Sequence, residues 1–164
     1  MRSELTEDEM QIVDEARRKA YLLYEGKVTP HRSCGICLAE TFGLPAAPFQ
    51  ALRRGGITGE GQCGAVIAGE LLLGQLLGDH NPTGPVTPQL REAIVHYKRR
   101  WKETLDLGNS SDIVCNHLTA QFEDFDTPER RQFCTHLASE CAALVAETLL
   151  LCDVEVEIKP LRTG

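Results

Sequence analysis

Residues 55–69 read GGITGEGQCGAVIAG, a glycine-rich loop that runs directly into an apolar helix. Glycine allows left-handed backbone conformations and lets another group approach the chain closely. The first reactive side chain on the expected helix is Cys63. A thiol at a helix N-terminus feels the positive end of the helix dipole, which favours the thiolate, and the thiolate is both the nucleophile and the metal ligand. The stretch therefore indicates sulfur chemistry centred on Cys63.

The helix that follows this loop is expected to run from about Gln62 to Leu77 and to end at Gly78. Its residues are apolar on nearly all sides, which is typical of a helix buried in the middle of a bundle. Small residues form a patch along it where another backbone can pack closely: Gly64, Ala65, Ala68 and Gly69.

Apolar residues at spacings of three and four, bounded by capping signals, predict further helices on both sides. Thr6 and Glu9 form a capping box, and Thr87 and Thr127 each precede a proline at the first helical position. Ser111 is expected to cap a short helix that carries Cys115 and Leu118. The other expected helices span residues 6–26, 33–43, 49–54, 87–108 and 127–152.

Val154, Val156 and Ile158 alternate with charged residues, but the sequence offers no partner strand. It also contains no internal repeat and no βαβ pattern. We therefore predict an all-α fold, a compact bundle of five to seven helices around the buried glycine- and alanine-rich helix. At 164 residues the chain is expected to form one domain, residues 1–164, with 153–164 as an extended tail.

The net charge of -7 argues against nucleic acid and against anionic membrane surfaces as partners, because both attract basic proteins. The longest apolar run, Ala65 to Leu77, is shorter than the roughly 18 residues of a membrane span and contains Glu70. Residues 1–10 are acidic and lack the apolar core of a signal peptide. We therefore expect a cytoplasmic protein without a membrane span.

Cysteine is unusually frequent, with seven residues and no secretory signal. In a reducing compartment, so many cysteines favour metal binding, an iron–sulfur cluster or redox chemistry over a disulfide framework. Cys34 and Cys37 form a C-x-x-C motif, but Leu38 stands where covalent haem attachment needs a histidine. The βαβ context of a thioredoxin and the second C-x-x-C of a zinc ribbon are both absent from the sequence.

Three cysteines fall on the last predicted helix, at spacings of seven and eleven residues: Cys134, Cys141 and Cys152. Both spacings are near whole turns, so the three share one face, but neighbours are about 10 Å or more apart along the axis. At most one of them can join a site with Cys63. Cys141 lies mid-helix, where a core site is expected, and Cys134 and Cys152 are expected to be dispensable.

The order of these motifs resembles the family of putative redox-active proteins named for a C…GCAxxG…C…C pattern. The resemblance rests on Cys34, residues 61–69, Cys115 and Cys141, with similar flanking residues LAETFGL after the first cysteine, CNHL at 115–118 and CAALV at 141–145. It covers roughly residues 16–151. The choice between Cys34 and Cys37 as the first site cysteine stays open, with Cys34 preferred.

The resemblance implies a cysteine-lined centre and leaves three interpretations. The first is a small redox protein whose cysteines bind an iron–sulfur cluster or another thiophilic metal for electron transfer: Cys34, Cys63, Cys115 and Cys141. Gly61 and Gly64 would then bring backbone N–H groups close to the bound group.

The second interpretation is a thiol–disulfide oxidoreductase or redox sensor without a cofactor. Cys63 would be its low-pKa nucleophile, and Cys34 or the Cys34/Cys37 pair would resolve the disulfide. The third is a non-catalytic helical binding module whose cysteines belong to the core. A redox partner protein is expected for the first two, while the oligomeric state, monomer or homodimer, stays open.

Overall fold

This computed structural model describes residues 1–162, which contain six α-helices and one 3-10 helix. The elements are α1 (Glu7–Glu25), α2 (Cys34–Thr41), η1 (Ala47–Leu52), α3 (Gly64–Leu77), α4 (Pro88–Thr104), α5 (Cys115–Thr119) and α6 (Pro128–Leu151). These described residues contain no strand, only an isolated bridge between Gln62 and Val114. The predicted all-α fold is confirmed.

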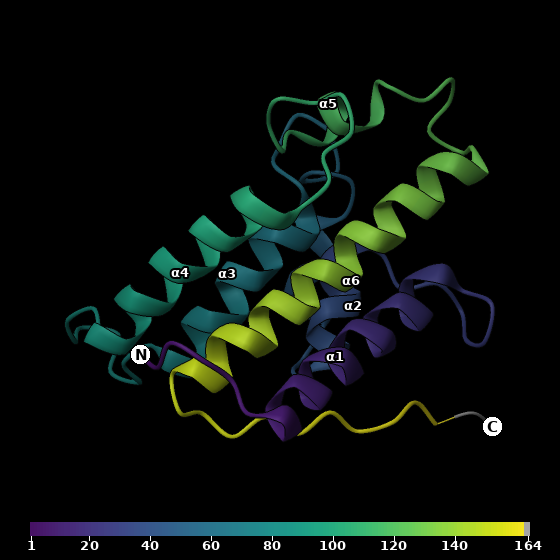
Figure 1. Ribbon diagram of the computed structural model, residues 1–164. Helices are drawn as coiled ribbons and strands as arrows, with labels where there is room; N and C mark the ends of the chain where they lie inside the picture. Colours follow the sequence, from purple (N-terminus) through teal and green to yellow (C-terminus); the bar gives the residue numbers. More distant parts are fainter. Residues whose placement is uncertain (163–164) are drawn as a thin grey trace.

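The longest helix, α6, packs against α1, α2, α3 and α4, and it lies alongside α1 over most of its length (Figure 1). The glycine- and alanine-rich α3 packs against α2, α4, α6 and η1. Fully buried side chains on both helices form the middle of the core, among them Val66, Leu72, Leu73, Val145 and Leu149. The predicted buried helix is therefore present, and it shares the centre of the bundle with α6.

Most helix ends follow the capping signals in the sequence. Thr6 and Glu9 form the complete capping box of α1, and Gly26 ends that helix in a left-handed conformation at φ 78°. The side chains of Thr87 and Thr127 accept backbone N–H bonds at the starts of α4 and α6. Capping hydrogen bonds thus fix these three helix starts locally, as the sequence predicts.

The start of the short helix α5 does not follow its capping signal. It begins at Cys115, after Val114, so the expectation that Ser111 caps it is wrong. Its first N–H groups are bound by carbonyls of the glycine loop instead, Cys115 by Gly61 and Asn116 by Gly59, both at 2.9 Å. A tertiary contact therefore sets the start of α5, which a local capping rule does not detect.

Within residues 1–162, one helix, α6, is long and apolar enough to cross a membrane by length and composition alone. The qualifying window of this helix is 78% buried inside the molecule, as expected for the core helix of a bundle. The predicted tail contains neither helix nor strand from Val154 to Arg162, and Val156 in it is buried. Residues 163–164 of that tail lie outside the described part.

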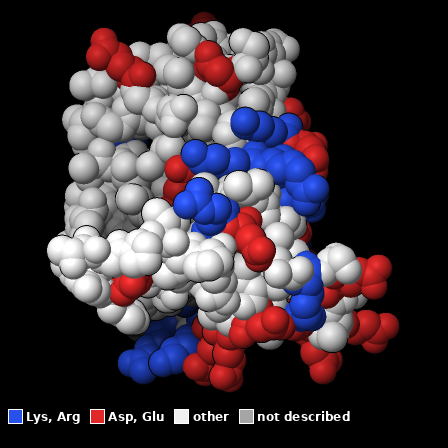
Figure 2. Space-filling model, turned by 90° about the vertical axis from the view of Figure 1, so that its left-hand side faces the viewer, with Lys and Arg blue, Asp and Glu red and all other residues white. Residues whose placement is uncertain are grey.

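Basic and acidic side chains lie next to one another along the right-hand side and the lower edge of the face drawn in Figure 2. On α4, for example, Lys98 pairs with Glu70 of α3, and Arg100 pairs with Glu147 of α6. These ion pairs connect α4 to α3 and to α6.

We predict that Gly69→Ala destabilises the protein by about 1–3 kcal/mol, because a methyl group there would lie 2.1 Å from the hydroxyl oxygen of Tyr97. Tyr97 cannot easily move, since it is fully buried and donates a 3.0 Å hydrogen bond to the Val66 carbonyl. The matched control is Gly74→Ala in the same helix, where a methyl group meets nothing within 4 Å. It should stabilise the helix by about 1 kcal/mol. Urea unfolding measures both, and equal effects would contradict the packing argument.

Candidate functional site

Four cysteines line one small enclosed cavity where the starts of three helices meet the first third of α6. Its volume is about 20 Å³, which is room for about one water molecule. Cys34 is the first residue of α2, Cys63 immediately precedes α3, Cys115 is the first residue of α5, and Cys134 lies on α6. The other lining residues are mostly apolar: Tyr24, Gly64, Ala65, Leu118, Thr119, Leu137 and Ala138.

The glycine loop places two of these cysteines side by side. The Cys63 N–H donates to the Ile113 carbonyl at 2.6 Å, and the Cys115 N–H donates to the Gly61 carbonyl at 2.9 Å. Gly55 has a left-handed φ of 59°, and a methyl group on it would lie 2.4 Å from the Cys115 Cβ. The loop backbone therefore packs directly under Cys115 and fixes it relative to Cys63.

Gly61 and Gly64, the two glycines predicted to face a bound group, both lie in close backbone contacts. A methyl group on Gly64 would lie 2.1 Å from the Leu52 carbonyl oxygen and 3.1 Å from the Cys34 Cβ. One on Gly61 would lie 2.7 Å from the Gly55 carbonyl oxygen. Gly64 also borders the cavity. The observed role of both glycines is to let η1, Cys34 and the loop approach Cys63.

Burial dominates the ionisation of the two innermost thiols. It raises the pKa of Cys34 to about 11 and that of Cys63 to about 12. The backbone N–H groups of Ala65 and Val66 act on Cys63, and that of Arg54 acts on Cys34; each lowers the thiol pKa, but by less than burial raises it. The expectation that Cys63 is a low-pKa nucleophile is therefore wrong for the metal-free protein, because desolvation outweighs the helix N-terminus.

Burial also raises the pKa of Cys115 and Cys134, although positive charges oppose the rise. Arg54 and Arg130 both lower the pKa of Cys115, and Arg130 lowers that of Cys134. Cys115 and Cys134 are both half-buried, and α5, which carries Cys115, lies at the edge of the molecule (Figure 1). The cavity thus has an N–H-rich side at Cys34 and Cys63 and a cationic side at Cys115 and Cys134.

Cys141 does not line this cavity; Cys134, two turns earlier on α6, takes the position that was predicted for Cys141. Cys34, Cys63 and Cys115, at the starts of their helices, lie near the N-terminal part of α6. Cys141, at the middle of α6, lies two turns farther along the helix axis than Cys134. Cys141 is fully buried against the Tyr97 hydroxyl. The shared helical face of Cys134 and Cys141 was visible in the sequence, but their axial position was not.

The remaining cysteines lie apart from the cavity. Cys37 is fully buried in the core one turn after Cys34, so Cys34 is the cavity residue of the C-x-x-C motif. Cys152 follows the far end of α6, where its carbonyl accepts a hydrogen bond from Gln89. All seven cysteines are free thiols. Within residues 1–162, no group of three or more His, Cys, Asp or Glu side chains is arranged so that it could hold a metal ion.

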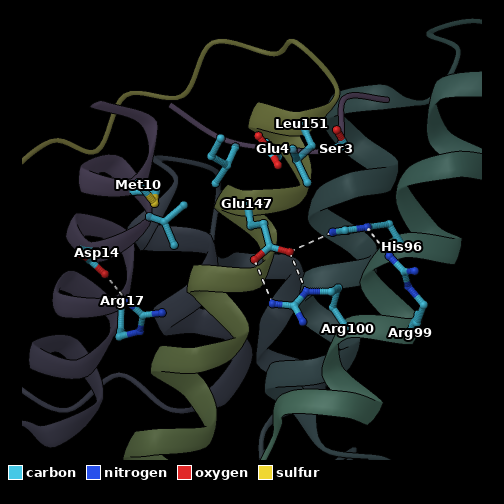
Figure 3. Close-up of a pocket in the computed structure, with 12 residues that line it drawn as sticks. Ser3, Glu4, Met10, Asp14, Arg17, His96, Arg99, Arg100, Glu147 and Leu151 are labelled. Atoms are coloured by element: carbon cyan, nitrogen blue, oxygen red, sulfur yellow. Dashed lines mark hydrogen bonds and ion pairs between the residues drawn. The ribbon is translucent and has the colours of Figure 1, made fainter. Parts of the chain in front are cut away.

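A larger, open groove of about 660 Å³ lies between α1, α4 and the end of α6, and no cysteine borders it. Figure 3 shows Glu147 on its wall between His96 and Arg100, at 2.9 Å from His96 Nε2 and 2.8 Å from Arg100 Nε. Burial tends to raise the pKa of Glu147, but hydrogen bonds from Arg100 and His96 hold it below its usual value. This carboxylate is thus already paired, and the network ties α4 to α6.

Comparison with protein families gives one match. A family model described as "Putative redox-active protein (C_GCAxxG_C_C)" matches residues 32–148, which include all four cavity cysteines and exclude Cys152. No protein with a curated description and no solved structure matches the chain.

We predict that Gly55→Ala destabilises the protein more than Gly56→Ala does. Both glycines have left-handed φ angles, 59° and 74°, so alanine is strained at either position. Only at Gly55 does the methyl group also meet the Cys115 Cβ at 2.4 Å, whereas at Gly56 its nearest neighbour is 4.0 Å away. Gly55→Ala should also speed alkylation of Cys115, measured by mass spectrometry. Equal stability and equal alkylation in the two variants would contradict the proposed packing.

We also predict that the metal-free, reduced protein loses stability as the pH rises above about 9. The folded pKa values of Cys34 and Cys63, about 11 and 12, lie above the ordinary value of 9.0. Unfolded thiols therefore release protons first, so stability falls with rising pH until the folded pKa values are passed. Urea unfolding across this range should show a smaller fall for the Cys34→Ser/Cys63→Ser double variant. An identical fall would mean that these thiols are not responsible.

Proposed function

The chain belongs to the C_GCAxxG_C_C family of putative redox-active proteins, and we propose that its redox centre is an iron–sulfur cluster held by the four cavity cysteines. These are Cys34, Cys63, Cys115 and Cys134. When bound, such a cluster accepts one electron and passes it on, so the protein would transfer electrons between partner proteins. The observation that carries this proposal is the convergence of four thiols, from four separate segments, on one enclosed cavity.

The number and burial of the thiols favour a bound centre over thiol–disulfide exchange. Two cysteines suffice for a disulfide couple, whereas four are the usual ligand set of [2Fe–2S] and [4Fe–4S] clusters. Exchange also needs an accessible thiolate. Cys63 is buried and Cys34 is half-buried, and their pKa values are about 12 and 11, so neither forms a thiolate readily. Metal coordination removes the proton from a thiol outright, so it can form the thiolates that burial otherwise prevents.

The surroundings of the four sulfurs fit a negatively charged centre. Backbone N–H groups of Arg54, Ala65 and Val66 act on Cys34 and Cys63, and the charges of Arg54 and Arg130 act on the other two. Donors and cations of this kind stabilise thiolates. No carboxylate among residues 1–162 lines the cavity.

The arrangement of the ligands argues against a single bound ion. A structural zinc site needs four ligands around one ion, and within residues 1–162 no three such side chains are arranged to hold one. A cluster distributes its four cysteines over several irons, so it does not need them all around one ion. Loading requires the 20 Å³ cavity to widen. Movement of Cys115, on the short helix α5, would break the hydrogen bonds of α5 to the glycine loop but not the packing of the long helices.

We predict that anaerobic reconstitution with iron and sulfide gives a brown protein in which iron and acid-labile sulfide are present in equal amounts. Cys134→Ser should lose most of this iron, whereas Cys141→Ser and the remote control Cys152→Ser should retain it. Iron and sulfide analysis and electron paramagnetic resonance of the dithionite-reduced protein measure the outcome.

Retention of the cluster in Cys134→Ser together with its loss in Cys141→Ser would assign the fourth ligand to Cys141. A colourless protein that instead shows a reversible two-electron thiol–disulfide couple would overturn the cluster proposal. That result would favour exchange chemistry at the same cysteines.

A further inference from the structure

Arg130 is a buried cation without a carboxylate partner. Only 7% of its surface is exposed, and no Asp or Glu among residues 1–162 lies within salt-bridge distance of it. Its guanidinium donates hydrogen bonds to the Phe125 carbonyl and, at 3.4 Å, to the Tyr24 hydroxyl. Both acceptors are neutral. Burying an unpaired charge is costly, so a buried arginine in this setting calls for a source of negative charge.

A second arginine lies at the same place. The Arg130 guanidinium carbon lies 3.9 Å from the centre of the Phe125 ring, and that of Arg54 lies 4.4 Å from it. Arg54 also has no carboxylate partner in the described part of the chain, and its backbone has a left-handed φ of 51°. Two guanidinium groups are therefore held against one aromatic ring, although cations repel each other.

The groups that these cations face are cysteines of the cavity. Arg130 precedes Cys134 by one helical turn on α6, and residues four apart on a helix are neighbours. Tyr24, which receives the Arg130 hydrogen bond, itself lines the cavity. The cations thus lie at the Cys115 and Cys134 side of the cavity. Neutral thiols would leave the charge of the buried Arg130 uncompensated, whereas thiolates would neutralise it.

We propose that Arg130, supported by Arg54, is the counter-charge of the cysteine centre and raises its reduction potential. This inference rests on the proposed function. Four thiolates give a bound iron–sulfur centre a net negative charge, and reduction adds one further electron without removing a ligand. A fixed positive charge stabilises the more negative, reduced form, so its removal shifts the equilibrium towards the oxidised form.

The test compares Arg130→Met, which removes the charge, with Arg130→Lys, which keeps the charge but loses the planar fork of donors. The matched control is Arg131→Met, which removes the same charge from the neighbouring, exposed position of α6. The potential of the reconstituted protein is measured by redox titration with mediator dyes. Arg130→Met should make reduction about tenfold less favourable, about 59 mV for one electron. Arg130→Lys and Arg131→Met should stay near the wild type.

A purely structural role for Arg130 gives a different pattern. It predicts that Arg130→Met and Arg130→Lys destabilise the metal-free protein equally in urea, because both lose the bonds to Phe125 and Tyr24, and that neither changes the potential specifically. If Arg130→Met does not fold, Arg54→Met provides the same comparison at an exposed position, with a smaller shift in the same direction.

The outcomes separate the two proposals. A wild-type protein that binds no cluster overturns the proposed function, and the counter-charge with it. A wild-type protein that binds a cluster whose potential is unchanged in both Arg130→Met and Arg54→Met overturns the counter-charge alone.

Discussion

The backbone hydrogen bonds between the glycine loop and the start of α5 are the contact on which the site depends. Cys63 donates to Ile113, Cys115 donates to Gly61, and Asn116 donates to Gly59. Because α5 has only five residues, it cannot be stable by itself. The loop therefore acts as its template, and left-handed glycines are needed where the backbone turns under Cys115. The arrangement brings together two cysteines that are 52 residues apart in the sequence.

Burial and nearby positive charge have opposite effects on the pKa values of the cavity thiols, and this opposition explains why the site suits metal binding better than nucleophilic chemistry. Burial raises the pKa values of Cys34 and Cys63 from 9.0 to about 11 and about 12, so these thiols form still less thiolate at neutral pH than an exposed cysteine does. The N–H groups and arginines around the cavity do not overcome this effect in the metal-free protein, but they stabilise negative sulfur once a metal has displaced the protons. The same surroundings that make the thiols poor nucleophiles thus make them suitable ligands.

Local signals in the sequence were sufficient to predict several helix starts and to identify Cys63 as a candidate site residue. Capping residues gave the starts of α1, α4 and α6, and the glycine loop pointed to Cys63. The start of α5 was missed because carbonyls of a distant loop cap it. Cys134 was passed over because Cys141, on the same helical face, lies mid-helix, where a core site was expected. Only the packing of α6 against the other helices determines which of the two cysteines reaches the cavity. The ionisation of Cys63 was misjudged because the helix dipole is readable from sequence, whereas the depth of burial is not.

The glycines around Cys63 allow neighbouring segments of the chain to approach closely, rather than making room at the Cys63 sulfur. Gly64 admits the Leu52 carbonyl and Cys34, so it sets the distance of η1 and α2 from Cys63. Gly69 admits the Tyr97 hydroxyl, which donates a hydrogen bond to the Val66 carbonyl and lies against Cys141. Gly69 and Cys141 each lie about one helical turn beyond a cavity residue, Ala65 and Ala138, so Tyr97 and Cys141 pack together next to the cavity. A motif of one cysteine and spaced glycines thus specifies how closely three other segments approach that cysteine, and the remaining cysteines are brought to it by those segments.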